Sequence, residues 1–149
     1  MKFTAMKRIL LHLFLLLPFI SVAQWTVSSG INSGRNDDIF FVNDSVGYVA
    51  GGGRDNISKS TDGGNTWTNV YTGGSYLRAI EFLDASTGFC GSLDSIFLMT
   101  TDSGNTWVNI ANNITPNPKG ICGLSIPDDS TIYGCGIFNQ PAFIVKSID

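Results

Sequence analysis

The 149-residue chain has 12 acidic and 9 basic residues, 17 glycines and 10 phenylalanines, and only 14% of its residues are charged. This balance excludes a disordered chain, a coiled coil and a basic nucleic-acid binder. The single histidine, His12, lies in the leader described next. Without it, the rest of the chain lacks the imidazole of Ser-His-Asp, Cys-His and His-ligated zinc sites, so we expect no cofactor and no metal site.

The amino-terminal segment, residues 1–23, has the pattern of a secretory signal peptide. Three basic residues within the first eight precede an apolar run at residues 9–20, and small residues follow at 21–23. As a helix the run would rise only about 18 Å, against the roughly 30 Å of a membrane's hydrocarbon core. We predict export to the periplasm, the cell surface or the medium, a mature chain of residues 24–149, and no membrane span after cleavage.

One octapeptide occurs twice in the chain. Ser60–Trp67 reads STDGGNTW and Thr100–Trp107 reads TTDSGNTW, while Ser147–Asp149 repeats the first three positions. The apolar residues before each copy repeat as well. The spacing of the two copies lies within the range of about 20 to 50 residues that indicates stacked structural units.

Each repeat contains four short β-strand candidates, which in the middle repeat are residues 80–83, 88–91, 96–100 and 107–110. No part of the mature chain has a sustained helical period. The sequence therefore predicts an all-β fold made of about three four-stranded antiparallel β-propeller blades, which form an incomplete propeller. The expected segments are a blade-closing strand at about 25–30, repeats at about 37–74 and 78–113, and a truncated repeat at about 119–149.

The octapeptide joins the third and fourth strands, where the chain must reverse. Asp62 and Asp102 can accept hydrogen bonds from backbone N–H groups two residues onward, and Gly64 and Gly104 can adopt the positive φ that a reversal requires. We expect the two tryptophans to be buried. The residues given this structural role are Ser60, Asp62, Gly64, Thr66, Trp67, Thr100, Asp102, Gly104, Thr106, Trp107, Ser147 and Asp149.

This octapeptide resembles the Asp-box, or bacterial neuraminidase repeat, whose pattern SxDxGxTW is met in full by Ser60–Trp67. Thr100–Trp107 meets it with Thr in place of Ser. Together with the preceding Gly47–Gly51, the sequence looks most like the blades of the photosystem II stability and assembly factor family. The resemblance implies a propeller fold, and it implies no particular activity.

Asp37, Arg78 and Lys119 form the candidate binding rim. Each lies two residues before an isoleucine at the start of a repeat, namely Ile39, Ile80 and Ile121. The first strand of each blade lines the central channel of a propeller, so these residues converge on one rim and could bind a peptide loop or a small anion. The alternative is that they are solvated loop residues. The other candidates for the same face are Asp38, Arg54, Tyr76 and Glu81.

We interpret the chain as an exported, non-catalytic propeller segment that binds or scaffolds another protein, with carbohydrate as the alternative ligand and no nucleic-acid partner. The other hypothesis is the amino-terminal part of a secreted sialidase-like or other glycoside hydrolase. Such an enzyme needs three arginines, a tyrosine, a glutamate and an aspartate, and Arg35, Arg54, Arg78 and Glu81 show no recognisable spacing.

Two further expectations concern completeness and the cysteines. Propellers close with at least about four blades, so we expect the remaining blades to be encoded downstream. Cys90, Cys122 and Cys135 allow at most one internal disulfide. Cys122 and Cys135 could pair across neighbouring strands, or all three could be small buried hydrophobic residues.

Overall fold

The structure is a computed structural model that describes residues 24–28, 31, 34–51, 53, 55–136 and 143–147. The predicted leader, Arg54 and Asp149 lie outside the described residues. Within these ranges the chain forms eleven β-strands and one short 3₁₀ helix, η1 (Ala111–Asn113). No helix among them is long and apolar enough to cross a membrane.

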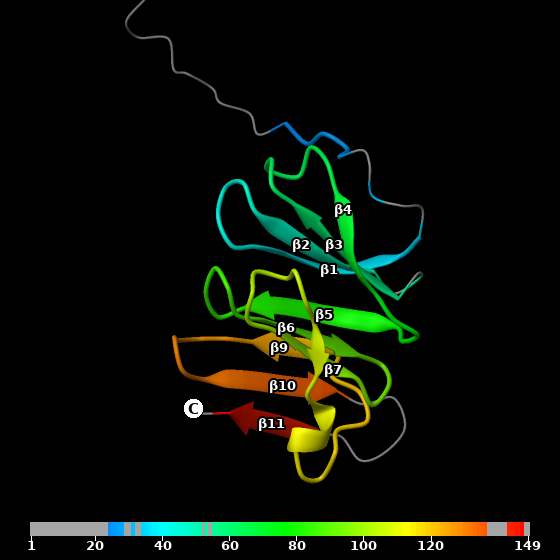
Figure 1. Cartoon of the computed structure of the whole chain (residues 1–149), viewed down its shortest axis with the longest axis vertical. Helices are drawn as coiled ribbons and strands as arrows, with labels where there is room; N and C mark the ends of the chain where they lie inside the picture. Colours follow the sequence, from blue (N-terminus) through cyan, green and yellow to red (C-terminus); the bar gives the residue numbers. More distant parts are fainter. Residues whose placement is uncertain are drawn as a thin grey trace, which may run out of the picture.

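The strands form three antiparallel sheets, which we call blades 1 to 3, and which follow one another along the long axis of the molecule (Figure 1). Blade 1 contains β1 (Asn36–Phe41), β2 (Gly47–Gly51), β3 (Asn56–Ser60) and β4 (Thr68–Thr72). Blade 2 contains β5 (Leu77–Phe82), β6 (Gly88–Ser92), β7 (Phe97–Thr100) and β8 (Val108–Asn109). Blade 3 contains β9 (Gly123–Ser125), β10 (Ile132–Gly136) and β11 (Phe143–Ser147). The all-β prediction of incomplete propeller blades is confirmed.

The third repeat differs from the prediction in its register. The sequence comparison aligned Ile121 with Ile80, whereas the strand pairing aligns Leu124 with Ile80, because these two residues lie opposite Gly134 and Cys90. The connection between β8 and β9 is longer than the one before β5 and contains η1. Ile121 therefore precedes the strand, and its side chain is fully buried between blades 2 and 3.

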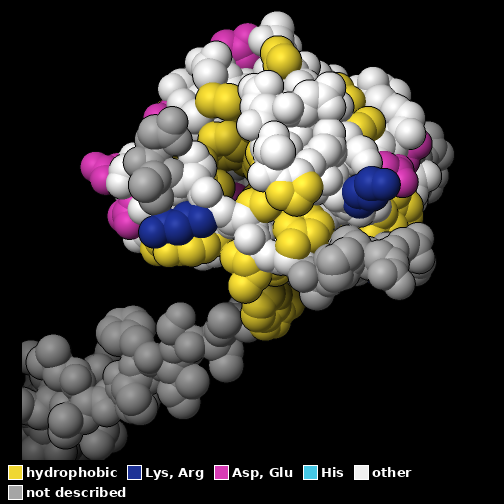
Figure 2. All heavy atoms as spheres, turned by 90° about the horizontal axis from the view of Figure 1, so that it is seen from below, with side chains coloured by type: hydrophobic (Ala, Val, Ile, Leu, Met, Phe, Trp, Pro, Cys, Tyr) yellow, Lys and Arg dark blue, Asp and Glu magenta, His cyan; other side chains and the backbone are white. Residues whose placement is uncertain are grey.

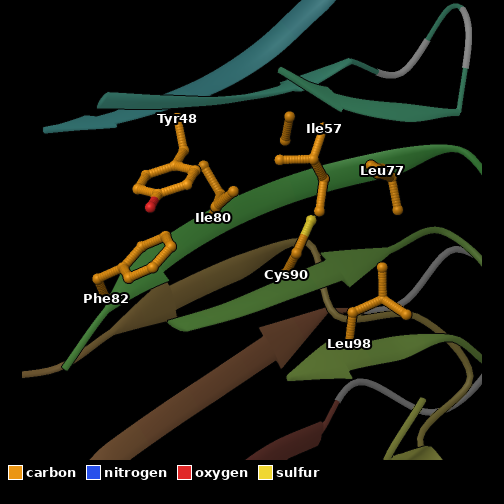
Figure 3. Close-up of a cluster of buried hydrophobic side chains, with 8 residues drawn as sticks. Tyr48, Ile57, Leu77, Ile80, Phe82, Cys90 and Leu98 are labelled. Carbon is orange, nitrogen blue, oxygen red and sulfur yellow. The ribbon is translucent and has the colours of Figure 1, made fainter. Parts of the chain in front are cut away.

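Blades 1 and 2 are held together by an apolar core (Figure 3). Tyr48 from β2 stacks on Phe82 from β5 with ring centroids 4.1 Å apart. Its hydroxyl donates a hydrogen bond of 2.7 Å to the carbonyl of Ser103 in blade 2. Ile57 of blade 1 and Leu98 of blade 2 belong to the same core cluster and are also fully or almost fully buried. A single blade could not bury this surface, so the two blades stabilise each other.

A glycine and a phenylalanine occur as a pair in the first two blades. A Cβ atom on Gly47 would lie 2.6 Å from the Phe41 ring, and one on Gly88 would lie 2.5 Å from the Phe82 ring. Each ring therefore lies directly over a residue that has no side chain. In blade 3, Ile126 takes the place of the phenylalanine and Ile132 takes the place of the glycine. Two side chains of medium size thus fill the space that one large ring fills in the other blades.

The octapeptide turns form a dense hydrogen-bond network. Asp62 accepts bonds from the Thr66 amide at 2.9 Å and the Thr66 hydroxyl at 2.6 Å, and the Ser60 hydroxyl donates to Asp62 at 2.8 Å. The Gly64 amide donates to the Ser60 hydroxyl at 2.9 Å. The second turn repeats this network with Thr100, Asp102, Gly104 and Thr106.

The structure tests three details of the turn prediction. The aspartate binds the residue four positions onward rather than two, because the reversal is wider than a simple Asx turn. The expected positive φ is confirmed, at 85° for Gly64 and 74° for Gly104. The tryptophans are half-buried rather than buried, since each indole packs edge-on against a phenylalanine at the rim of its blade, Trp67 on Phe41 and Trp107 on Phe82.

A second repeated turn joins the first two strands of every blade, and the sequence comparison missed it. Oδ1 of its first residue accepts bonds of 2.6–3.0 Å from the amides two and three positions onward. The accepting residues are Asn43, Asp84 and Asp128. In blades 1 and 2 a carbonyl of this turn also accepts a 2.9 Å bond from the octapeptide turn, which joins the two reversals.

Candidate functional site

The candidate site lies where the first strands of the blades begin. β1 packs beside β5, and β5 packs beside β9. In both β1 and β5 one extra residue interrupts the pairing with the second strand: Asp37 in β1 and Arg78 in β5. Such β-bulges redirect a side chain out of the regular alternation. The two bulged residues meet across the blade boundary.

Asp37 is the centre of a small ionic cluster. One of its oxygens, Oδ1, lies 2.7 Å from Arg35 Nε and 3.1 Å from Arg78 Nη1. The Asp37 side chain is only 3% exposed, whereas the side chains of Arg78 and Arg35 are 31% and 63% exposed. The carboxylate is therefore buried beneath two guanidinium groups, and the part of the cluster that faces solvent is cationic.

The cluster is not fully satisfied by its own hydrogen bonds. Asp37 Oδ2 and Arg78 Nε are buried and have no hydrogen-bond partner. Unpaired buried polar atoms are costly, and native structures keep few of them. The exposed parts of the Arg35 and Arg78 guanidinium groups can bind carboxylates and backbone carbonyls, whereas the buried Asp37 Oδ2 would need a donor.

Asp38 connects the same two blades through the backbone. Its Oδ1 accepts a 2.9 Å bond from the Ile39 amide, and its Oδ2 accepts a 2.9 Å bond from the Ile80 amide of the next blade. Both carboxylate oxygens thus bind backbone N–H groups of β1 and β5. Asp38 is a structural link beside the cluster.

The third member of the predicted rim lies elsewhere. Lys119 is exposed in the connection before β9 and lines a different cavity together with β11. Arg78 lies two residues before Ile80, and Cys122 lies two residues before Leu124, the equivalent of Ile80. Cys122 is therefore the blade 3 equivalent of Arg78, and the two residues are close enough to interact electrostatically. The structure thus brings Asp37 and Arg78 together and separates Lys119 from them.

Two other candidates lie near the cluster. The Arg35 guanidinium is 5.9 Å from the centroid of the Tyr76 ring, within the range of a cation–π contact. Glu81 points from β5 toward blade 3, and burial and the charge of Asp38 raise the pKa of its carboxyl above the ordinary value. Arg54 lies outside the described residues.

The aspartates of the octapeptide turns accept their hydrogen bonds from within the turns. Hydrogen bonds from the side chain and backbone of Thr66, and from Ser60, lower the pKa of Asp62 to about 2. Thr106 and Thr100 lower the pKa of Asp102 to about 2 in the same way. These carboxylates hold the turns, and in the part of the chain that the structure describes no three Cys, Asp or Glu side chains are grouped as a metal site would require.

The three cysteines are free thiols. Cys90 is fully buried in the core of blades 1 and 2, and burial raises the pKa of its thiol. The Cys122 amide donates a 2.8 Å bond to the Cys135 carbonyl, so these two residues are neighbours across adjacent strands without a disulfide.

Comparison with known proteins supports the fold. No protein-family model matches the sequence, and no curated protein is similar enough to match. Among solved structures, one described as YCF48 bound to D1 peptide has a TM-score of 0.67 and 18% identity, with 89% of this chain and 42% of that chain covered.

A second similar structure is a GH74 enzyme from Niastella koreensis, with a TM-score of 0.55, 29% identity, and coverage of 72% of this chain. The chain spans 42% of the first structure's length and 20% of the second's. Both matches agree with the repeated antiparallel sheets. The fold of the chain is therefore that of β-propeller blades.

Proposed function

We propose that this chain is a non-catalytic propeller module that binds an extended segment of another protein at the Asp37–Arg78 cluster. The observation that carries the proposal is the arrangement of two partly exposed guanidinium groups over one buried carboxylate. A peptide offers backbone carbonyls and a carboxyl end or acidic side chains, which are the groups that arginine recognises. The buried Asp37 fixes the position of both arginines before the ligand arrives, which reduces the entropy lost on binding.

The comparisons support the fold on which this proposal depends. One similar structure is described as bound to a peptide, which concerns that protein, and its 18% identity bears on the fold alone. The choice of a protein ligand over a carbohydrate therefore depends on the charge and geometry of the cluster. We also propose that the protein acts outside the cytoplasm, because its amino-terminal segment, residues 1–23, has the pattern of a signal peptide.

Arg78→Gln tests the binding proposal. We expect this variant to bind acidic or carboxyl-terminal peptides selected from a peptide array at least about tenfold more weakly, since a charge-assisted contact is lost. Lys119→Gln is the matched control, because Lys119 is exposed and separate from the cluster. Titration calorimetry with the purified chain measures both. Equal affinity of the Arg78→Gln variant and the unaltered protein would contradict the proposal.

A glycoside hydrolase is the second candidate, and one observation favours it. Glu81 has a raised pKa and lies near Asp38, and a pair of carboxylates with different environments is what acid catalysis of glycoside cleavage needs. Incubation of the purified chain with chromogenic sialosides and with plant polysaccharides tests this candidate. Hydrolysis that Glu81→Gln abolishes would favour the enzyme over the binding module.

A further inference from the structure

Two of the three cysteines lie together where blade 3 begins. Cys122 comes directly before β9, and Cys135 lies in β10, the strand that pairs with β9. The Cys122 amide donates a 2.8 Å hydrogen bond to the Cys135 carbonyl. With standard bond lengths, this bond holds the two Cα atoms within about 6.7 Å of each other, inside the range of about 4.4–6.8 Å that disulfides span. The two backbones are thus at a distance that a disulfide can bridge.

A bulge lets the two side chains share one side of the sheet. In a regular ladder neighbouring residues point to opposite faces, so the residue before Gly123 would point away from Cys135, the partner of Gly123. The Cys122 amide binds the carbonyl of that same partner, so Cys122 and Gly123 together oppose one residue. Two residues opposite one define a β-bulge, and this one lies at the place of the bulges in β1 and β5. Cys122 can therefore face Cys135.

The residues nearest the two thiols on the opposite strands have no side chains. A Cβ atom on Gly123 would lie 3.2 Å from Cys135 Sγ, and one on Gly136 would lie 3.2 Å from Cys122 Sγ. The thiols are also close enough to affect ionisation: burial raises the pKa of the Cys122 thiol, the charge of Arg78 opposes this, and the neighbouring Cys135 adds to it. The two sulfur atoms thus have room to meet by rotation about their Cα–Cβ bonds.

Solvent reaches this pair and does not reach the third cysteine. Cys135 is exposed and Cys122 is half-buried, whereas Cys90 is fully buried in the core of blades 1 and 2. A dissolved oxidant therefore meets Cys135 first. Cys90 is shielded from it, since a buried thiol in apolar surroundings is inert.

A link between these residues would join the strands of blade 3 where their pairing is short. β9 contains three residues, whereas β1 and β5 contain six each. Figure 2, which views the molecule from the β11 end, shows hydrophobic side chains in the middle of that face, and Ile144 of β11 is 76% exposed. A covalent link stabilises a fold mainly by restricting the unfolded chain, so a bond between β9 and β10 would strengthen this blade.

We propose that Cys122 and Cys135 form a reversible dithiol–disulfide site that an oxidant of the disulfide class, such as oxidised glutathione, closes. The Cys135 thiolate attacks one sulfur of the oxidant, forms a mixed disulfide and releases one thiolate. The Cys122 thiolate then attacks the Cys135 sulfur, forms the internal disulfide and releases the second thiolate. The two cysteines lose two electrons and two protons, which leave with the oxidant as two thiols. Only the supply of oxidant rests on the proposed location outside the cytoplasm.

The site adjoins the cluster at the boundary of blades 1 and 2. Cys122 is the blade 3 equivalent of Arg78 and interacts with it electrostatically. In the dithiol form a titratable thiol lies beside this guanidinium, and in the disulfide form a neutral bond fixes the bulge of β9 there. The redox state of the pair therefore sets what the rim presents next to Arg78.

Mass spectrometry of tryptic peptides tests the proposal. Trypsin cleaves after Lys and Arg, so Cys90 falls in peptide 79–119 and the pair falls together in peptide 120–146. The folded chain is equilibrated with oxidised and reduced glutathione, its remaining thiols are alkylated, and it is digested. We expect peptide 120–146 to carry no alkyl group and to be lighter than its reduced form by two hydrogen atoms. Peptide 79–119 should be alkylated at Cys90, and excess dithiothreitol should return both thiols of the pair.

Comparison with the unfolded chain shows whether the fold brings the thiols together. We expect the equilibrium constant for closing the disulfide from glutathione to be at least about tenfold higher in the folded chain than in urea, because the strands hold the thiols closer than a flexible connection does. Cys135→Ser should leave Cys122 able to form only a mixed disulfide with glutathione. Cys90→Ala is the control and should close the disulfide as the unaltered protein does.

Circular dichroism checks that each variant is folded in buffer and unfolded in urea. The proposal is overturned if glutathione forms only mixed disulfides with the folded chain, if Cys90 takes part in the link, or if Cys135 joins two chains. An equilibrium constant no higher in the folded chain than in urea also overturns it. Each of these results leaves the peptide-binding proposal standing, because that proposal is measured separately with Arg78→Gln.

Discussion

Single carboxylates in this protein stabilise turns. Asp62 and Asp102 each accept several bonds within one octapeptide turn, and their pKa values of about 2 follow from those bonds. A carboxylate with its folded-state pKa below the unfolded value of about 3.9 contributes stability above that value. This contribution is lost as the pH falls through the range from about 4 to about 2.

We therefore predict that the melting temperature of the protein falls steeply between about pH 4 and pH 2. Asp62→Asn and Asp102→Asn should each lower the melting temperature at neutral pH and make the acid loss shallower, since one titrating group is removed. Asp129→Asn, at an exposed position, is the control. Thermal unfolding followed by circular dichroism across this range measures the effect. An equally steep acid loss in the Asn variants would be evidence against the assignment.

Position 104 requires glycine for two reasons, its backbone conformation and the closeness of its neighbours. Its φ is 74°, and a Cβ atom there would lie 2.7 Å from Tyr48 Cε1. We predict that Gly104→Ala lowers the free energy of unfolding by roughly 2 kcal/mol or more, because strain and overpacking add. Gly74→Ala, where a Cβ atom would meet nothing within 4 Å, should change it by less than about 0.5 kcal/mol. Chemical denaturation of both variants measures the difference.

Strand pairs and the contacts between blades give the fold its cooperativity. Tyr48 belongs to β2, stacks on β5 and hydrogen-bonds the turn before β8, so one side chain joins three parts of two blades. Burial, followed by the charge of Asp102, raises the pKa of its hydroxyl. The hydroxyl thus remains a donor at neutral pH.

We predict that Tyr48→Phe lowers the free energy of unfolding by about 0.5–1.5 kcal/mol, since the ring contact is kept and one hydrogen bond is lost. Tyr76→Phe keeps the ring that Arg35 approaches and should have little effect. Urea denaturation of the two variants compares them. If both variants unfold at the same urea concentration as the unaltered protein, the Tyr48 bond does not couple the blades.

The whole molecule is a stack of blades in which each sheet buries its faces against its neighbours. Blades 1 and 2 share one apolar core, and blades 2 and 3 share another.

The repeat, the all-β class and the octapeptide reversals could be predicted from the sequence because they depend on short-range features. A recurring octapeptide, Gly64 and Gly104 at the reversals, and an aspartate that bonds within its own turn are visible in a few neighbouring residues. The Asx residues of the second turn were also visible, in the spacing of Asn43, Asp84 and Asp128 from the serines that follow them.

The candidate site required the packed chain. Asp37 and Arg78 meet because a bulge occurs at the same point of β1 and β5, and no residue pattern marks such a bulge in advance. The alignment of Leu124 with Ile80 likewise depends on hydrogen bonds between β9 and β10. Lys119 lies two residues before Ile121, as Arg78 lies two residues before Ile80, yet it is not at the rim. Contacts between blades join residues a whole repeat apart in the sequence, and strand register and burial decide which residues these are.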